Sequence, residues 1–189
     1  MFLKINHIVD LHDARYAAAE GVHSITLCAD RNHHHNLSES MIAEFISWLS
    51  GIEVLLDLGT DYEQISLCRK YNLGAQIRFS KDFSKIDFQP KIITYSIEEI
   101  RYLPQVSDNQ YYEFIFPSFT QPKLVKEVSD FIGNKNIIIQ ADSMPEEYFS
   151  QLKPVGWAWE NKLKSDNGLL DFDEFERIYQ EVSAVSKIR

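Results

Sequence analysis

The chain has 189 residues, which fits one domain and falls slightly short of the roughly 200 residues of an ordinary eightfold α/β barrel. Its net charge of −9 argues against nonspecific nucleic-acid binding, and two cysteines do not make a disulfide framework, so a reducing cytoplasm is expected. No apolar run approaches the roughly 20 residues of a membrane span, and there is no signal-peptide pattern. We therefore expect one cytoplasmic domain over residues 1–189, with no membrane or nucleic-acid partner.

Eight short runs of apolar and β-branched residues are predicted to be strands. Each run is almost continuously apolar, as expected for parallel strands that helices cover from outside. In chain order the predicted strands are Leu3–Ile8, Ser24–Cys28, Glu53–Leu58, Ala75–Phe79, Lys91–Tyr95, Tyr112–Phe116, Asn136–Gln140 and Gly156–Trp159.

Helix signals lie between these runs. Ser96-Ile-Glu-Glu is a capping-box pattern, and Gly21 is placed to end the first helix. Only Lys81–Phe88 lacks a clear pattern, and we expect the regular alternation to break there. The predicted helices start near Asp10 or Asp13, Ser38, Asp61, Ser96, Thr120, Ser143 and Asp171, and the last covers Phe172–Val185.

The regular alternation of strand and helix predicts a parallel sheet. Eight repeats favour closure into a (β/α)8 barrel, because a doubly wound open sheet more often has five or six strands. No Gly-rich fingerprint follows Ile8, so dinucleotide binding has little support. We expect Leu3–Ile8 to pair with Gly156–Trp159 and close the ring.

In a closed α/β barrel, the functional site lies at the carboxyl ends of the strands. Four of the polar residues there are carboxylates and Arg78 is the one fixed cation, a charge balance poorly suited to a phosphate monoester. The polar residues at the predicted strand ends are Asn6, His7, Asp30, Asp57, Arg78, Tyr95, Ser118, Asp142 and Glu160.

Several scaffold motifs match one family pattern. They are Lys4-Ile5, Asp13-Ala14 with the Ala-Ala-Ala-Glu-Gly that follows, Gln76, Pro145-Glu146, and Gly168 with Asp171. They resemble phosphoribosylanthranilate isomerase, an enzyme of tryptophan biosynthesis, and the resemblance covers almost the whole chain. It implies a single TIM barrel like the ribulose-phosphate-binding barrels and an intramolecular isomerase of the Amadori type, and we expect neither a cofactor nor a metal.

The positions that carry the family's chemistry are substituted. The family's first strand ends in Lys-Ile-Cys-Gly with Cys as the general base, and here Asn6 and His7 replace Cys and Gly. The family's general acid, an Asp after the sixth strand, corresponds to Pro117. Asp142 and Glu160 stand where the family has glycine and serine around the phosphate.

These substitutions predict an inactive or diverged isomerase. An Amadori isomerisation needs one group to take a proton from a sugar carbon and another to protonate the ring oxygen, and neither Asn nor Pro does so. His7 is the one nearby group with a suitable pKa and is the candidate for a rewired base. Side chains alternate along a strand, however, so His7 points away from the mouth if Asn6 points into it.

Other polar residues offer ligand contacts. His35 is nearest to the Arg of the family's Ser-Pro-Arg loop, and His33-His34-His35 could bind a metal with Cys28 or Asp30. We favour a solvated loop, because three consecutive residues do not easily aim at one ion. Asp57 and Arg78, on adjacent strands, are expected to pair inside the barrel. The predicted ligand-binding residues are Asn6, Asp30, His35, Asp57, Arg78, Asp142 and Glu160.

Three functions remain open on these residues. The first is an isomerase with rewired acid and base. The second is a barrel that binds another small molecule or does other chemistry, and the third is a non-enzymatic interaction protein on a barrel scaffold. A filled mouth with an apolar patch elsewhere would favour the third function. The chain is expected to be a monomer or a homodimer.

Overall fold

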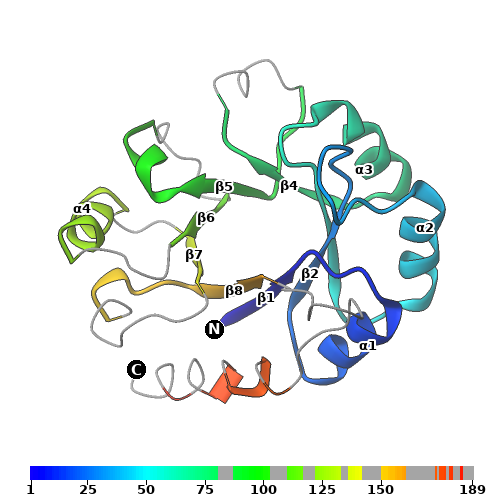
Figure 1. The fold of residues 1–189 in the computed structure, drawn as a ribbon, viewed down its shortest axis with the longest axis horizontal. Coiled ribbons are helices and arrows are strands. Elements are labelled where there is room, and N and C mark those ends of the chain that lie inside the picture. Colours follow the sequence, from blue (N-terminus) through cyan, green and yellow to red (C-terminus); the bar gives the residue numbers. More distant parts are fainter. Residues whose placement is uncertain are drawn as a thin grey trace.

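The computed structural model describes residues 1–80, 87–102, 110–116, 122–132, 136–141 and 150–160, together with 173, 175–177, 179, 180 and 184. Within these residues, eight parallel strands form a closed barrel in sequence order (Figure 1). The strand β1 pairs with β8 in register, from Phe2 opposite Gly156 to Asn6 opposite Glu160. The predicted (β/α)8 barrel and its closing contact are therefore confirmed.

The strands lie where the apolar runs predicted them. The bounds of β2 and β7 are as predicted, and the other six begin and end within two residues of the prediction. The strands are β1 (Phe2–Asn6), β2 (Ser24–Cys28), β3 (Glu53–Asp57), β4 (Gly74–Arg78), β5 (Ile92–Ser96), β6 (Tyr111–Ile115), β7 (Asn136–Gln140) and β8 (Gly156–Glu160).

Side-chain caps fix the starts of the first two helices. The Asp10 carboxylate accepts hydrogen bonds from the backbone N–H groups of His12 and Asp13, and the Ser38 hydroxyl accepts one from Met41. The helical segments are α1 (Leu11–Ala19), α2 (Glu39–Trp48), the short 3-10 helix η1 (Tyr62–Gln64), α3 (Ile65–Tyr71), the 3-10 helix η3 (Ile97–Tyr102) and α4 (Pro122–Ile132).

The segment after Ser96 and the helices near the carboxyl end differ in how well the structure tests their predictions. The Ser96 backbone N–H donates to the Glu99 carboxylate at 2.8 Å, as the capping box predicts, but the segment it opens is a 3-10 helix. Most of the predicted break at Lys81–Phe88, namely residues 81–86, and most of the helix predicted after Ser143 lie outside the described residues. The described residues from 173 to 184 are helical, and Phe175 of that helix packs on Trp159 with ring centroids 5.9 Å apart.

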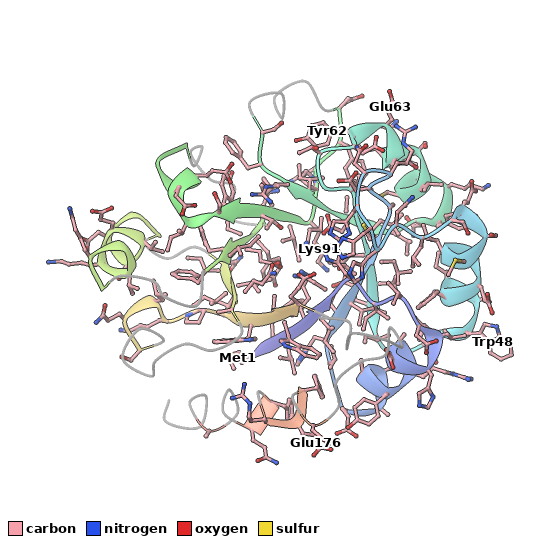
Figure 2. All side chains as sticks on the ribbon, viewed as in Figure 1. Met1, Trp48, Tyr62, Glu63, Lys91 and Glu176 are labelled. Atoms are coloured by element: carbon pink, nitrogen blue, oxygen red, sulfur yellow. The ribbon has the colours of Figure 1, made fainter. Side chains whose placement is uncertain are left out.

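Two apolar clusters hold the barrel together. The larger cluster fills the space between the strands and the surrounding helices and includes Ile5, Phe45 and Trp157. The smaller cluster joins Leu55, Ile92, Ile138 and Ala158 of four different strands, and it fills the lower part of the barrel interior. Side chains occupy the barrel centre, whereas Trp48 projects from the outside of α2 (Figure 2). The barrel is thus a packed scaffold, and polar residues at its carboxyl end are held on a rigid rim.

No helix among the described residues is both long enough and apolar enough to cross a bilayer.

Candidate binding site at the mouth of the barrel

A cavity of about 170 Å³ opens at the carboxyl ends of the strands. Six residues predicted from the sequence line it, namely Asn6, His7, Asp30, Asp57, Arg78 and Glu160. The rest of the lining consists of Cys28, His33, Gly59, Thr60, Gln76, Thr94, Ile115 and Gln140. The mouth is therefore open, and most of the residues that line it have polar side chains.

His7 lies in the cavity together with Asn6, so the prediction that it points away from the mouth is wrong. Strand β1 ends at Asn6, and the backbone of His7 has a φ of 54°, in the left-handed region. The backbone N–H of His7 donates to the Thr26 hydroxyl at 2.9 Å, which holds this turn. Alternation applies only within a strand, and a left-handed residue costs a non-glycine side chain roughly 1–2 kcal/mol.

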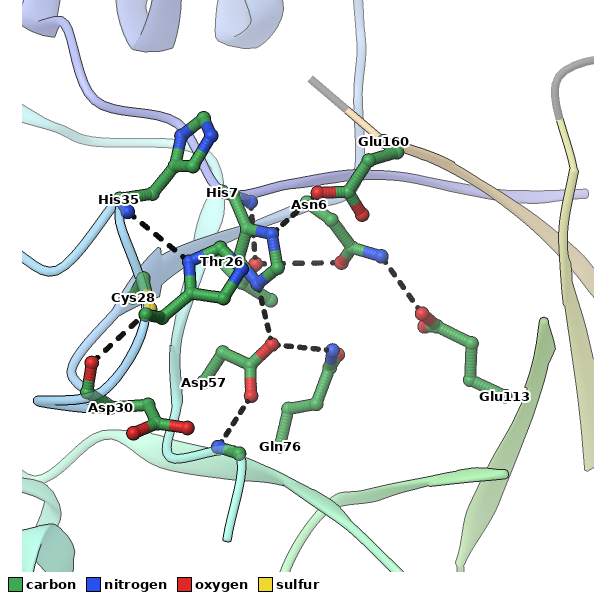
Figure 3. Close-up of polar contacts among 12 residues, drawn as sticks. Asn6, His7, Thr26, Cys28, Asp30, His35, Asp57, Gln76, Glu113 and Glu160 are labelled. Carbon is green, nitrogen blue, oxygen red and sulfur yellow. Dashed lines mark hydrogen bonds and ion pairs between the residues drawn. The ribbon is translucent and has the colours of Figure 1, made fainter. Parts of the chain in front are cut away.

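The His7 ring bridges two carboxylates. Its Nδ1 lies 2.5 Å from a Glu160 oxygen and its Nε2 lies 2.8 Å from an Asp57 oxygen (Figure 3). Burial lowers the pKa of His7, but the hydrogen bonds to Asp57 and Glu160 outweigh it and raise that pKa to about 10. At neutral pH, His7 is therefore an imidazolium whose two N–H groups both donate.

Asp57 pairs with His7, so its predicted pairing with Arg78 is wrong. The Asp57 carboxylate also accepts hydrogen bonds from the Gln76 amide at 3.1 Å and from the Gly59 backbone N–H at 2.9 Å. Burial alone would raise the pKa of Asp57, but its bond to His7 and the charge of His7 keep that pKa below its ordinary value. Among the residues that the structure describes, the Arg78 guanidinium has no hydrogen-bond or ion-pair partner.

A polar network forms the floor of the cavity, where Asn6 and Gln140 line it, and continues beneath the floor to the fully buried Lys4 and Glu113. The Lys4 ammonium donates to Glu113 of β6 at 2.5 Å and also to the Asn6 side-chain oxygen. The Asn6 amide nitrogen donates to Glu113 at 2.8 Å and to Gln140 at 3.1 Å. The Gln140 amide then donates to Glu160 at 2.8 Å, which joins this network to the His7 bridge.

The loop after β2 brings a second imidazole to the cavity. Its backbone folds back on itself, because His33 donates to the Asp30 carbonyl at 3.0 Å and Leu37 donates to the Cys28 carbonyl at 2.9 Å. The Asp30 carboxylate also accepts from the Asn32 backbone N–H at 2.9 Å. The loop is thus a defined turn that places His33 over the cavity.

An ion pair anchors the same loop to the neighbouring connection after β3. The Arg31 guanidinium donates to both oxygens of Asp61, at 2.6 and 2.9 Å, and to Glu63 at 2.6 Å. A two-pronged bond of this kind fixes orientation as well as distance.

The three consecutive histidines point to different places. His33 lines the cavity, its ring 4.5 Å from that of His7. His34 is exposed, whereas His35 is buried away from the cavity lining with its Nδ1 unbonded among the described residues. Burial, with the nearby charge of His7, lowers the pKa of His33, so this imidazole is neutral. His35, a predicted ligand contact, therefore does not line the cavity, and the loop contributes His33 to the lining.

Two predicted positions, Pro117 and Asp142, lie outside the described residues. Two other residues were missed, Glu113 and Gln140. A single carboxylate in the apolar run Tyr111–Ile115 was a usable signal for the first, because a buried carboxylate needs a partner. The family motif offered a signal for His7, since a Gly position is one where a positive φ has no steric cost.

Comparison with solved structures gives full-length matches. The TrpF structure from Jonesia denitrificans has a TM-score of 0.79 at 14% identity and covers 100% of both chains. Phosphoribosylanthranilate isomerase from Thermotoga maritima has a TM-score of 0.73 at 11% identity, over 97% of this chain and 99% of that one. The Thermus thermophilus enzyme has a TM-score of 0.69 at 13% identity, over 98% and 100%. The barrel has the fold of phosphoribosylanthranilate isomerase.

Sequence comparison adds nothing to this likeness. No protein-family model matches the chain. No curated protein sequence matches it either. The same fold also carries different chemistry, since a variant of the citrate synthase SbnG matches with a TM-score of 0.61 at 13% identity, over 98% and 93% of the two chains. The function must therefore be argued from the residues at the mouth.

Proposed function

We propose that this chain is a diverged barrel of the phosphoribosylanthranilate isomerase type that binds a small polar molecule at its mouth and does not catalyse the Amadori isomerisation. The observation that carries the proposal is the state of Asn6 and His7. Both groups that could stand in for the family's base are already bound to neighbours in the barrel.

Asn6 stands at the position of the family's catalytic Cys and is fixed in the buried network. Its amide oxygen accepts from Lys4 and its nitrogen donates to Glu113 and Gln140. An amide has no proton affinity near neutral pH, so Asn6 cannot remove the sugar proton. Losing one general base removes roughly 10²- to 10⁴-fold of rate.

His7 is no substitute for that base. Each ring nitrogen faces a carboxylate, so the imidazolium has no vacant lone pair with which to accept a proton. Its pKa of about 10 places it in the protonated state across the physiological range. His7 therefore donates hydrogen bonds and carries charge, which is a binding role.

The missing acid is not replaced from β6 either. Glu113 is the carboxylate on that strand, but it is completely buried and its two oxygens are bound by Lys4 and Asn6. It lies beneath the cavity lining and does not reach the open space.

The open mouth favours a small ligand over the interaction-protein alternative. Arg78, whose guanidinium has no partner among the described residues, can donate to an acceptor or an anion, and the Asp30 carboxylate at the rim offers acceptors to a donor. Asp57 and Glu160 oppose a phosphate at the bottom of the cavity. A polar molecule that carries both donors and acceptors, neutral or zwitterionic, suits this lining best.

Complementation tests the proposal. The gene is expressed in a tryptophan auxotroph that lacks phosphoribosylanthranilate isomerase, with an active family member as the positive control. We expect no growth without tryptophan, although the protein is present in soluble form on an immunoblot. Growth that disappears in His7→Ala would overturn the proposal and assign His7 as the rewired base.

A further inference from the structure

We infer that the mouth of the barrel holds a first-row transition metal ion, zinc(II) being the best match, bound by His7, Cys28 and His33. This inference goes beyond the proposed function and stands without it, because it does not depend on which organic molecule enters the cavity. From the sequence alone we favoured a solvated histidine loop; the approach of His7 to Cys28 and His33 changes that interpretation.

Three donor atoms of the right kind converge in the cavity. One ligand atom from each of His7, Cys28 and His33 lies within 4.8 Å of the other two. Zinc binds sulfur at about 2.3 Å and imidazole nitrogen at about 2.0–2.1 Å, so a tetrahedral site needs donors roughly 3.3–3.7 Å apart. Side-chain rotations that close each separation by about an ångström therefore complete the site, with no change in the barrel.

The three ligands come from rigid and independent parts of the fold. Cys28 is the last residue of β2, and His7 sits in the fixed left-handed turn after β1. His33 is on the loop whose ends are tied together by the Leu37–Cys28 hydrogen bond. Its Nδ1 accepts from the His35 backbone N–H at 3.2 Å, so Nε2 carries the ring proton in this tautomer, and binding a metal through Nε2 requires the proton to move to Nδ1 and this hydrogen bond to be given up. The backbone that carries the three ligands is therefore already in place without the metal ion.

Carboxylates around the ligands support a dication. Each nitrogen of His7 faces a carboxylate, Asp57 on one side and Glu160 on the other. Metal binding releases one proton from the His7 imidazolium and one from the Cys28 thiol, whose pKa burial raises to about 12, so the ion must displace both protons. When one nitrogen of His7 loses its proton to the metal, the other keeps its carboxylate, which is the arrangement that orients metal-binding imidazoles in proteins. Asp30 adds a third carboxylate to the cavity wall, against the single guanidinium of Arg78. The local charge therefore favours a metal ion of charge +2.

The donor set selects the class of metal. A thiolate with two imidazoles suits zinc and its neighbours cobalt, nickel and copper, whereas magnesium and calcium require oxygen ligands. Three protein ligands leave at least one coordination position directed into the cavity, as in catalytic zinc sites. A small molecule with an oxygen or nitrogen donor would be held there directly by the ion.

Cobalt(II) is the probe that tests the site, because a cobalt–thiolate bond gives a charge-transfer absorption band that nitrogen and oxygen ligands do not give. The purified full-length protein is stripped with a chelator, reduced, and titrated with CoCl2. We expect a thiolate band that saturates at one equivalent, with visible bands of tetrahedral intensity. Stoichiometric zinc should abolish both.

Matched variants locate the bound ion. Cys28→Ser should remove the thiolate band, and His33→Asn should weaken cobalt binding by roughly tenfold or more. Cys68→Ser and His34→Ala alter the other cysteine and the neighbouring loop histidine, which line no part of the cavity, and should leave the spectrum unchanged. Far-ultraviolet circular dichroism checks that each variant is folded.

Two results would overturn the assignment. One is a wild-type protein that binds no cobalt at stoichiometric concentration, and the other is a cobalt spectrum that is the same in wild type and Cys28→Ser. Neither result bears on the complementation assay, so the metal site and the loss of isomerase activity are judged separately.

Discussion

Two polar layers lie one above the other at the carboxyl end of this barrel, and their charged side chains differ in exposure to solvent. The floor layer consists of Lys4, Asn6 and Glu113, whose exposed fractions are 0%, 1% and 0%. The mouth layer consists of His7, Cys28, His33, Asp57 and Glu160, and it lines the cavity. The layers touch through Gln140, which accepts from Asn6 and donates to Glu160.

The polar groups of the floor layer stabilise the fold, whereas those of the mouth layer are accessible to a ligand. In the floor layer every charged group is paired inside the protein, so no charge is left for a ligand. In the mouth layer three charged side chains are partly exposed, at 13% for His7, 12% for Asp57 and 26% for Glu160. Asn6 lines the cavity, but its side chain is hydrogen-bonded to Glu113 and Gln140, so it belongs to the supporting network. Asn6 and His7 are adjacent in the sequence but belong to different layers.

The largest expected effect is on the floor layer. Glu113→Gln keeps the shape of the side chain but leaves the Lys4 ammonium buried without a countercharge, which should cost about 3–5 kcal/mol of unfolding free energy. Urea denaturation at pH 7 measures it. The double variant Lys4→Met with Glu113→Leu should be less destabilised than Glu113→Gln, and Glu160→Gln in the mouth layer should cost clearly less. Equal losses of unfolding free energy in Glu113→Gln and Glu160→Gln would contradict the distinction between a structural floor layer and a binding mouth layer.

A smaller effect concerns pH and the mouth layer. The folded-state pKa of His7, about 10, exceeds its unfolded value of 6.5, so its contribution is complete below pH 6.5 and is lost as pH rises through 10. In metal-free protein, the unfolding free energy should therefore fall by on the order of 1–3 kcal/mol between pH 6 and pH 9. The pKa of Asp57 is lowered in the folded protein, so the stabilisation that its carboxylate provides is present above about pH 3.8 and is lost as pH falls below that value.

The matched control is His7→Asn, which removes the titrating group and keeps a polar side chain. Its stability should change less than that of the wild type over the same pH interval in the presence of a chelator. A wild-type slope that survives the substitution would place the titration elsewhere in the protein.

The smallest expected effect is on anion affinity. The resemblance to the family predicts that Glu160 and Asp142 put carboxylates where family members hold a phosphate. At ~6 Å each repels a phosphate by on the order of 1–3 kcal/mol per unit charge at an effective dielectric of 20–40. Calorimetry with inorganic phosphate and ribose 5-phosphate should show no binding tighter than about 1 mM. Asp142→Gly with Glu160→Ser should raise phosphate affinity without restoring isomerisation, because Asn6 and Pro117 remain.

Prediction from sequence was strong for the scaffold because each strand is a short, continuously buried run. Ser24–Cys28 and Asn136–Gln140 were bounded correctly from apolar pattern alone. Ser38 was predicted as a helix start, and Asp10 was one of the two starts predicted for the first helix, because capping depends on residues close in the sequence. Helix caps and the pattern of buried residues along the chain are therefore enough to predict the strands and helices of the barrel.

The site was predictable only in part, because its contacts join residues distant in the sequence. Strand-end position brought Asn6, Asp30, Asp57, Arg78 and Glu160 to one cavity, as expected. The orientation of His7 depends on one positive φ just beyond β1, and no residue pattern within this chain encodes it. The choice between His33 and His35 depends likewise on how the loop folds back onto Cys28.

The central claim is that this barrel keeps the fold of phosphoribosylanthranilate isomerase without its reaction. The most direct measurement is a kinetic assay of the purified protein with phosphoribosylanthranilate, following the ketose product by chromatography, in the presence of zinc and separately of a chelator. The account predicts a rate no greater than that of the uncatalysed reaction in both conditions. Product formation above that rate, proportional to protein concentration and abolished by His7→Ala, would contradict it.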